Sequence, residues 1–416
     1  RVEGKLYRVV VHSLGEEGGK RQRLVRDIER VVRAQIALMG EPEYEQYTFI
    51  IHFDPTARRG DGMEHMNSTQ IVETRALADP GVLEGVLYGV SHEFFHVWNV
   101  KRLRPLGLGP WDFTRPVNTR GLWIAEGFTN YYGTLMLHRA GILSEDELLG
   151  EFGRTIGGVE SSHGSRLMSA EDSSLAASLL DWTPHVQRVN LANTSVSYYT
   201  KGEVLALVLD LLIRGRSRGA ASLDEVMRRA YDEFYLRSAN DSYYLRGRAY
   251  TNEEFFALAS RVAGFDLADF HTRHARHTAP PPYDESFAYA GLRLTRRPHE
   301  REPFNAGLTI DFRRPQGAFV GNVRPGSPAE RAGLNPGDEL VTIGKTNVTR
   351  DTWRAALSGF KQGDRVPVTV RRGRRTVQAT LTLEAPDNIV YGLEKIKDAP
   401  PEALALRAAW LRGDRR

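Results

Sequence analysis

Cysteine is absent from this 416-residue sequence. Disulfide bonds and thiolate metal ligands are therefore excluded, and only histidine, aspartate or glutamate could hold a zinc ion. Long apolar runs are also absent: the longest, from Val204 to Ile213, contains Asp210. A membrane-spanning helix needs about 20 predominantly apolar residues. We therefore expect no transmembrane segment.

The sequence also lacks a strong excess of either charge. It has 56 lysines and arginines against 52 aspartates and glutamates, a formal net charge of +4, and the basic residues are scattered along the chain. Without a basic stripe or arm, nucleic acid is not an expected partner. The chain begins at Arg1 rather than at methionine. We therefore expect this sequence to be a processed or truncated piece of a protein. The sequence does not indicate the cellular compartment of that protein.

The most informative motif is His-Glu-x-x-His at residues 92–96. Residues four apart on a helix lie on one face, so His92 and His96 can share one metal ion while Glu93 reaches a water molecule on that ion. A surface helix with two unrelated histidines is the alternative. The run from Leu83 to Trp98 has apolar residues at helical spacing, which favours a half-buried catalytic helix. The motif therefore indicates a zinc hydrolase.

The pattern along the chain predicts an α+β fold whose first domain covers residues 1–285. Strand-like segments and an amphipathic helix precede residue 83, and the pattern then becomes mainly helical. We expect a sheet-containing part at residues 1–82 and a mainly helical part at residues 83–285, as in a thermolysin-like catalytic domain. Three consecutive prolines at residues 280–282 mark the end of this domain.

After the prolines, short β-like runs alternate with glycine turns. This pattern predicts a second, β-rich domain at residues 286–386. Residues 387–416 are then expected to form a C-terminal tail or helix.

The sequence offers Glu126 as the third metal ligand. A metzincin would have glycine at position 99 and histidine at position 102, but this chain has asparagine and arginine there, which excludes that class. The other common solution takes a glutamate from the next helix, and Glu126 is the first glutamate after His96. Its apolar surroundings would make an unpaired carboxylate costly. The alternative is a carboxylate that interacts only with the helix dipole.

Two histidines and one glutamate leave a fourth zinc position for water, whose pKa zinc lowers towards neutrality. Glu93 could then accept a proton from that water and pass it to the leaving amine. One more donor is needed to stabilise the developing oxyanion. The local motif does not supply that donor.

Three short motifs resemble those of the gluzincin aminopeptidases of the M1 family. Trp123-x-x-Glu126-Gly-Phe is similar to their Trp-x-x-Glu-Gly-Phe signature. Tyr199-x-Lys-Gly resembles a sequence whose tyrosine hydroxyl stabilises the oxyanion, which implies that role for Tyr199. Gly62-Met-Glu64 partly matches Gly-x-Met-Glu-Asn, whose glutamate binds the free α-amine of the substrate. The resemblance implies this role for Glu64, with a plain strand-edge carboxylate as the alternative.

The order of these motifs, followed by a PDZ module, is similar to the M61 glycyl aminopeptidase family from about residue 1 to residue 385. The resemblance implies one Zn²⁺ per chain, bound by His92, His96 and Glu126, with Glu93 as the general base. It also implies release of N-terminal residues from peptides with a free N-terminus, with glycine or alanine preferred. It further implies an N-terminal β-domain, which this sequence does not include.

Residues 321–340 resemble the core of a bacterial PDZ domain. Pro328 can occupy the first turn of a short helix capped by Ser327, and Gly333 can end that helix. PDZ domains add a chain end as a strand to a sheet edge, which implies a C-terminal peptide as a second partner. The predicted carboxylate loop consists of Tyr289, Ala290, Gly291 and Leu292. A domain that only packs on the peptidase or gates it is the alternative.

The sequence therefore predicts a zinc-dependent aminopeptidase. The first alternative is a zinc endopeptidase regulated by its PDZ domain, and the second is a PDZ adaptor with a vestigial, non-catalytic peptidase domain. His271, His274 and His277 recur every third residue. This spacing suits exposed histidines at a domain edge better than a second metal site.

Overall fold

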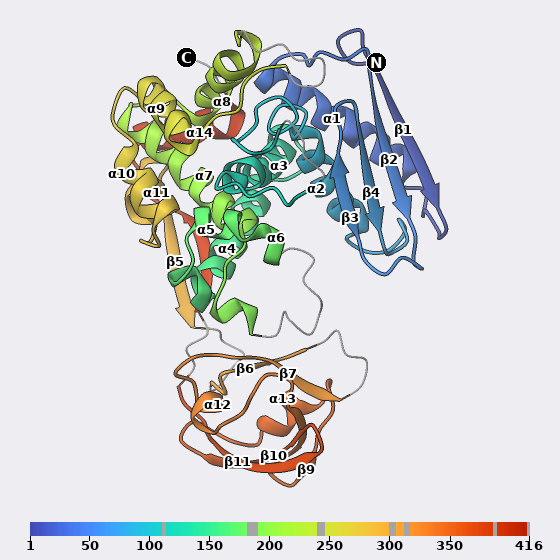
Figure 1. Ribbon diagram of the computed structural model, residues 1–416, viewed down its shortest axis with the longest axis vertical. Helices are drawn as coiled ribbons and strands as arrows, with labels where there is room; N and C mark the ends of the chain where they lie inside the picture. The colour runs from blue at the N-terminus through green and yellow to red at the C-terminus, as the bar shows by residue number, and fades with distance from the viewer. Residues whose placement is uncertain are drawn as a thin grey trace.

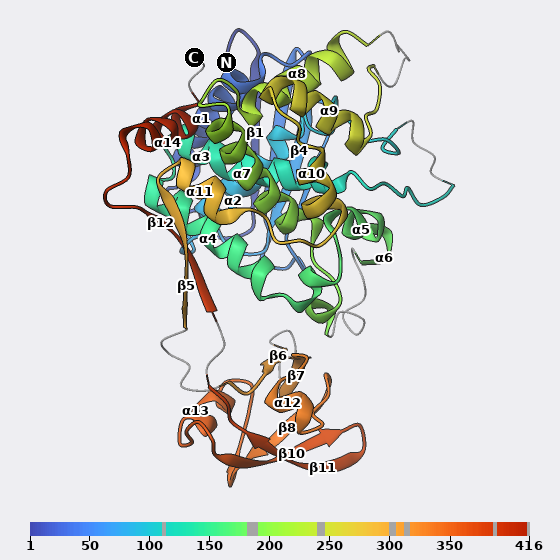
Figure 2. The ribbon, with the colours of Figure 1, turned by 90° about the vertical axis from the view of Figure 1, so that its left-hand side faces the viewer.

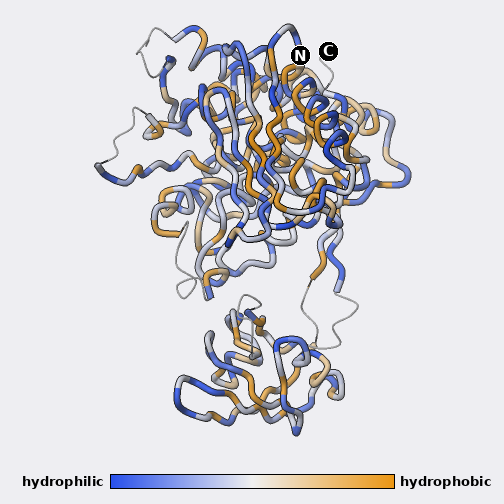
Figure 3. Tube along the Cα trace, turned by 90° about the vertical axis from the view of Figure 1, so that its right-hand side faces the viewer, coloured by the Kyte–Doolittle hydropathy of each residue, from blue (hydrophilic) through white to orange (hydrophobic). Residues whose placement is uncertain are grey.

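The chain folds into a larger part, which combines one sheet with most of the helices, and a smaller β-rich part (Figure 1). This confirms the predicted α+β fold. Each part has its own hydrophobic core. Hydrophobic segments run through the middle of the larger part, and its peripheral loops are largely hydrophilic (Figure 3). The computed structural model describes residues 1–109, 114–180, 190–238, 246–298, 305–311, 317–385 and 389–413.

Four strands form the sheet of the larger part: β1 (Leu6–Ser13), β2 (Gln46–Phe53), β3 (Asp61–Glu64) and β4 (Ser68–Glu73). Their order is β1-β2-β4-β3, with β1, β2 and β4 parallel and β3 antiparallel to β4. Alternate side chains of β2 are fully buried. Two of them, the aromatic rings of Tyr47 and Phe49, pack on Phe94. This period of two fixes which face of the sheet meets the helices.

Helix α2 (Val82–Phe95) carries the His-Glu-x-x-His motif and packs beside α1 (Arg21–Met39) behind the sheet (Figure 1). The predicted helix continued to Trp98, but the observed helix ends at Phe95. The amides of Val97 and Trp98 bond to carbonyls three residues back, at 3.1 Å each. Such bonds tighten the last turn and satisfy its free carbonyls. The turn buries Trp98 fully.

The remaining helices of the larger part follow α2 in the chain and lie mostly on the side of α2 away from the sheet (Figure 1). Among the described residues, none of the helices is long and apolar enough to cross a membrane. Their bounds are η1 (Trp123–Gly127), α3 (Phe128–Arg139), α4 (Glu145–Ser161), η2 (His163–Arg166), α5 (Ala170–Leu175), α6 (Ala177–Leu180), η4 (Leu191–Asn193), α7 (Tyr198–Arg216), α8 (Leu223–Tyr231), η5 (Asp232–Leu236), α9 (Asn252–Ala263), α10 (Ala268–Phe270), η6 (His271–Arg276) and α11 (Tyr283–Tyr289).

A two-stranded ribbon joins the two parts. Strand β5 (Leu292–Pro298) pairs antiparallel with β12 (Ile389–Lys395), and the ribbon runs from the larger part towards the smaller one (Figure 2). Helix α14 (Pro401–Arg412) then packs on the larger part, where Trp410 is fully buried. The core of the larger part therefore extends past the predicted boundary at residue 285. It also includes residues of the segment predicted as a C-terminal tail or helix, which forms α14. The prolines break local structure without ending the domain.

The smaller part is built on a six-stranded sheet. The order is β11-β10-β8-β7-β6, and β9 pairs with β8. Ser327 caps α12, and Pro328 occupies its first turn, as predicted. The bounds are β6 (Leu308–Ile310), β7 (Ala318–Val323), α12 (Pro328–Arg331), β8 (Glu339–Ile343), β9 (Thr346–Asn347), α13 (Trp353–Leu357), β10 (Arg365–Arg372) and β11 (Arg375–Thr382).

Strand β7 of the smaller part bonds directly to the η4 segment of the larger part. The amide of Asn190 donates to the carbonyl of Gly321 at 3.2 Å, and the amide of Val323 donates to Asn190 Oδ1 at 3.1 Å. Asn193 Nδ2 donates to the carbonyl of Val323 at 2.6 Å. Asn190 adopts φ 63°, a left-handed conformation that asparagine tolerates better than most residues. These bonds connect the two parts just before helix α7.

Candidate active site

Three side chains from two helices converge on one point. The two Nε2 atoms of His92 and His96 are 3.0 Å apart, and Glu126 Oε2 lies 3.3 Å from the first and 3.2 Å from the second. Donor atoms around a tetrahedral zinc ion, with bonds of about 2.0–2.2 Å, are roughly 3.3–3.5 Å apart. The three sequence-predicted ligands therefore have the spacing of a zinc site.

Two features support a cation at this point. The Oε2 atom of Glu93 is buried without a hydrogen-bond partner, and that of Glu126 is buried against the ring nitrogens of two histidines. Buried carboxylate oxygens are costly unless they are paired or bind a metal. The set of two imidazoles and one carboxylate is also a common catalytic zinc set with one open position. The residues present fit a zinc ion.

The end of α2 fixes the orientation of His96. Its Nδ1 lies 2.7 Å from the carbonyl of Asn99, which leaves Nε2 free to bind a metal. The Asn99 amide donates to the carbonyls of Ile124 and Ala125, at 3.0 and 3.1 Å. One residue therefore orients a histidine ligand and ties α2 to the turn that carries Glu126. The His-Glu-x-x-His motif does not reveal this role, because it ends at His96.

Glu126 lies in the π-helical turn η1, which continues into α3. Such turns are rare and often lie at functional sites, because they change the direction of one side chain. Helix α7 packs against this turn with backbone contact: a Cβ on Gly127 would clash with Gly202, and a Cβ on Gly202 would clash with the carbonyl of Trp123. The glycines of the two motifs therefore bring Glu126 and the start of α7 together.

The electrostatics of the ligand set are those of a tightly coupled cluster. Burial raises the pKa of Glu126, but the neighbouring histidines, His96 first, outweigh burial and hold this pKa far below its usual range. Burial lowers the pKa of His96, but the carboxylate of Glu126 outweighs it and raises this pKa to about 9. A metal ion would take the place of the proton that His96 otherwise keeps.

Glu93 lies beside the ligands and is 8% exposed. Burial raises its pKa, while His92 and His96 act in the opposite direction. Strand β3 passes so close that a Cβ on Gly62 would clash with Glu93 Oε1. The glycine of the partly matched motif therefore leaves room for the predicted general base.

Glu64 ends β3 and reaches the same region. Single ligand atoms of Glu64, Glu93 and His96 all lie within 4.8 Å of one another. Glu64 Oε1 is 2.9 Å from Lys101 Nζ, in an ion pair that the sequence did not predict. The side chains of Glu64 and Lys101 are 19% and 21% exposed. The predicted amine-binding carboxylate is therefore next to the metal ligands and already has a cationic partner.

Tyr199, on the first turn of α7, faces the histidines. Its ring centroid is 6.2 Å from that of His92, and it lines a cavity of about 300 Å³ together with Tyr88, Gly89, His92, Glu93, Asn130, Gly133 and Thr134. Tyr198, the competing tyrosine, is 5% exposed and stacks on Tyr199. Burial removes Tyr198 from the cavity, so the cavity favours Tyr199 as the side chain that meets a substrate.

The predicted carboxylate loop does not lie at the sheet of the smaller part. Tyr289 ends α11, Leu292 begins β5, and Ala290 and Leu292 are 0% and 1% exposed in the core of the larger part. The structure contradicts this assignment, because these apolar side chains are needed for packing.

The three regularly spaced histidines do not converge. His271 Nε2 lies 2.6 Å from Glu171 Oε1, whereas His274 and His277 each approach a backbone carbonyl. His271 and His274 are 4% and 5% exposed, so the expectation that they are surface residues was wrong. Of the residues that the structure describes, only the two clusters at the active site bring three possible metal ligands together.

Two segments of the chain match known protein families. Residues 86–205 match the family model described as M61 glycyl aminopeptidase, and residues 291–383 match the PDZ domain model. The first segment contains every predicted metal ligand as well as Glu93 and Tyr199, and Glu64 lies before it. The PDZ match begins at residue 291, directly before β5 and ahead of the six-stranded sheet.

One solved structure is similar over nearly the whole chain. It is the crystal structure of an aminopeptidase N family protein from Idiomarina loihiensis, with a TM-score of 0.84 and 26% identity, covering 99% of this chain and 69% of that chain. A Neisseria meningitidis protein of serogroup A, named as a proposed zinc metalloprotease, is 36% identical over 88 residues. That alignment covers 20% of each protein, so this chain spans about a fifth of that relative.

Proposed function

The chain carries an M61 glycyl aminopeptidase domain and a PDZ domain, and from this premise we propose that it is a zinc-dependent aminopeptidase. The observation that carries the proposal is the convergence of His92, His96 and Glu126 within 3.0–3.3 Å, beside the buried carboxylate of Glu93. The name of the Neisseria meningitidis relative supports the same metal and reaction class.

His92, His96 and Glu126 would hold one zinc ion, which when bound polarises water and the substrate carbonyl. Glu93 takes a proton from the attacking water and delivers it to the leaving nitrogen. The Tyr199 hydroxyl, at the wall of the cavity, donates a hydrogen bond to the carbonyl oxygen as negative charge develops there. Burial of Glu93 makes its carboxylate a stronger base than an exposed glutamate.

Glu64 makes the proposed enzyme an aminopeptidase rather than an endopeptidase. Its carboxylate lies near Glu93 and His96, at the end of the edge strand β3. There it would accept hydrogen bonds from the α-ammonium group of the first substrate residue. We propose small first residues, glycine or alanine, in keeping with the description of the matching family. The cavity wall includes Gly89 and Gly133.

Matched peptides that begin with alanine, one with a free N-terminus and one N-acetylated, test this function. The zinc-loaded full chain is expected to release the first residue from the free peptide and to leave the acetylated peptide intact, as read by mass spectrometry. Internal cleavage of the acetylated peptide would instead identify an endopeptidase. Stoichiometric zinc without cleavage of either peptide would identify a non-catalytic adaptor.

A second activity is favoured by the free edge of the smaller sheet. Among the described residues, β6 is the last strand at its end of the sheet. The carbonyl of Gly307 and the amide of Asp311 bond towards β7, so the amides between them, at Leu308 and Ile310, point away from it. We propose that this edge accepts the C-terminus of a peptide as an added strand.

Titration of the full chain with a fluorescent peptide tests this activity. The peptide carries either a free C-terminal carboxylate or an amide, and anisotropy reports binding. We expect the free carboxylate to bind at least tenfold more tightly, because it can accept hydrogen bonds from backbone amides. Equal affinities for the two peptides would show that the PDZ domain does not recognise a chain end.

A further inference from the structure

Lys101 stands where a substrate's own ammonium group is expected to bind. Its Nζ lies 2.9 Å from Glu64 Oε1, and Glu64 in turn belongs to the cluster that it forms with Glu93 and His96. Lysine and an N-terminal α-amine present the same chemical group, a primary ammonium with three N–H donors. The chain therefore contains an internal analogue of the group that Glu64 is proposed to recognise.

The backbone of Lys101 is firmly held. Its amide donates to the carbonyl of His96 at 3.0 Å, and its carbonyl accepts from Arg104 Nη1 at 2.6 Å. These bonds keep the residue just after the metal helix. The side chain is a flexible four-carbon stem that is 21% exposed, so its ammonium group can leave Glu64 for solvent while the backbone stays in place.

The charges around Glu64 make the two ammonium groups compete. The nearby carboxylates are those of Glu64, Glu93 and Glu126, and Lys101 already pairs with the first of them. An arriving α-ammonium group would have to share Glu64 with Lys101 at close range, where like charges repel, or displace it. In either case, the ion pair weakens recognition of the substrate's N-terminus.

We propose that Lys101 is a specificity-determining residue that sets the affinity for the substrate α-amine by competing for Glu64. This inference rests on the proposed function, because it takes Glu64 as the amine-binding group. When substrate binds, its α-ammonium group then replaces the ammonium group of Lys101 at Glu64. Lys101 weakens the preference for free N-termini without taking part in bond cleavage.

The substitution Lys101→Met tests the proposal, because methionine keeps an unbranched side chain and removes the charge. For a peptide with a free N-terminus, KM is expected to fall about tenfold, while kcat stays within about twofold. Lys101→Arg keeps a cation and should retain a KM near that of the wild type. Lys395→Met is the matched control. It breaks the ion pair between Lys395, on the ribbon and away from the site, and Asp146 of α4, and it should leave KM unchanged.

A binding measurement separates competition from a change in folding or chemistry. In chains that also carry Glu93→Gln, calorimetry should show tighter binding of the free peptide after Lys101→Met, and no change for the acetylated peptide. Adding Glu64→Gln should cancel the gain, as expected for a coupled pair. A KM or Kd that stays constant or rises after Lys101→Met would overturn the proposal, because Lys101 would then have no influence on Glu64 or would hold it in place. Equal cleavage of free and acetylated peptides by the wild type would instead refute the proposed function.

Discussion

Replacing Glu93 by glutamine is expected to lower kcat/KM by about 10³-fold while the chain still binds one zinc ion. Glutamine keeps the shape of the side chain but cannot accept the proton of the attacking water, and general-base catalysis contributes roughly 10²–10⁴-fold. Glu93 is not one of the three converging ligands, so the metal content should not change. Peptide hydrolysis rates and elemental analysis of the same preparation check both halves of this prediction.

Two variants act as controls for Glu93→Gln. Glu84→Gln makes the same change in the first turn of the same helix, where Glu84 is 47% exposed and pairs with Arg23, and should keep full activity. His92→Ala removes a ligand and should lose both metal and activity. Wild-type turnover in Glu93→Gln would exclude Glu93 as the base, and stoichiometric zinc in His92→Ala would exclude the ligand assignment.

Local rules predicted the elements whose signals lie within a few residues. Helix α9 (Asn252–Ala263) is bounded by such signals: Thr251 and Glu254 form a capping box at its start, and Gly264 ends it in a left-handed conformation. The helical repeat also placed His92 and His96 together, since residues four apart share a face. These features need no knowledge of tertiary contacts.

Contacts between segments that are far apart in the sequence could not be predicted from local patterns. Lys101 meets Glu64 only because β3 lies beside the turn after α2, and no local pattern pairs these two residues. The return of β12 and α14 to the larger part was missed for the same reason. A proline run looks the same at a domain boundary and inside a domain, and only the burial of Leu292 and Trp410 distinguishes the two cases.

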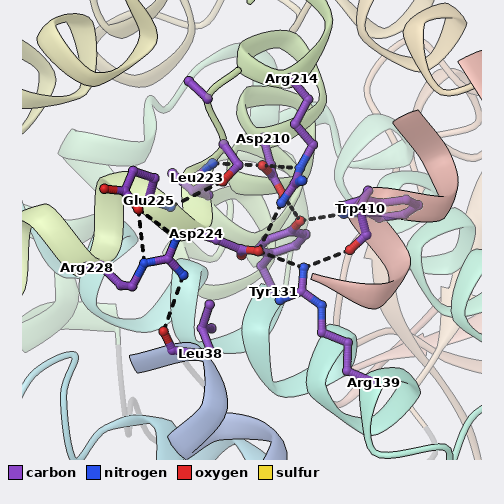
Figure 4. A network of polar contacts seen from close by, with 12 residues as sticks. Leu38, Tyr131, Arg139, Asp210, Arg214, Leu223, Asp224, Glu225, Arg228 and Trp410 are labelled. Carbon is purple, nitrogen blue, oxygen red and sulfur yellow. Dashed lines mark hydrogen bonds and ion pairs between the residues drawn. The ribbon is translucent and has the colours of Figure 1, made fainter. Parts of the chain in front are cut away.

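The substitution Asp210→Ala is expected to lower the free energy of unfolding of the larger part by about 3–5 kcal/mol, the range for removing one partner of a buried ion pair. Asp210 is fully buried and accepts hydrogen bonds from the Tyr131 hydroxyl at 2.6 Å, from Arg214 Nε at 2.9 Å and from the amide of Leu223 at 2.8 Å (Figure 4). Alanine would leave these buried donors without their acceptor.

The effect should extend to the C-terminal helix. Trp410 Nε1 donates to the Tyr131 hydroxyl at 2.8 Å, and Arg139 Nη2 bonds both the Trp410 carbonyl, at 2.7 Å, and Asp224, at 2.9 Å (Figure 4). Asp224 is also bonded to Arg214, at 3.0 Å. The same buried charges therefore hold α3, α7 and α14 together. Losing Asp210 leaves two arginines beside the single carboxylate of Asp224.

Thermal unfolding of the full chain measures this loss, with an expected fall of roughly 5–10 °C in the midpoint of the larger part. Lys395→Met, which removes a 2.6 Å ion pair between exposed side chains, should cost no more than about 1 kcal/mol. A midpoint for Asp210→Ala as high as that of Lys395→Met would mean that the buried network does not stabilise the fold.

Helix α3 approaches His92 so closely that a Cβ on Gly133 would lie 3.3 Å from the backbone of that ligand. Zinc affinity should therefore decline together with the stability of this network, whereas the peptide affinity of the PDZ domain, which has its own core, should not change.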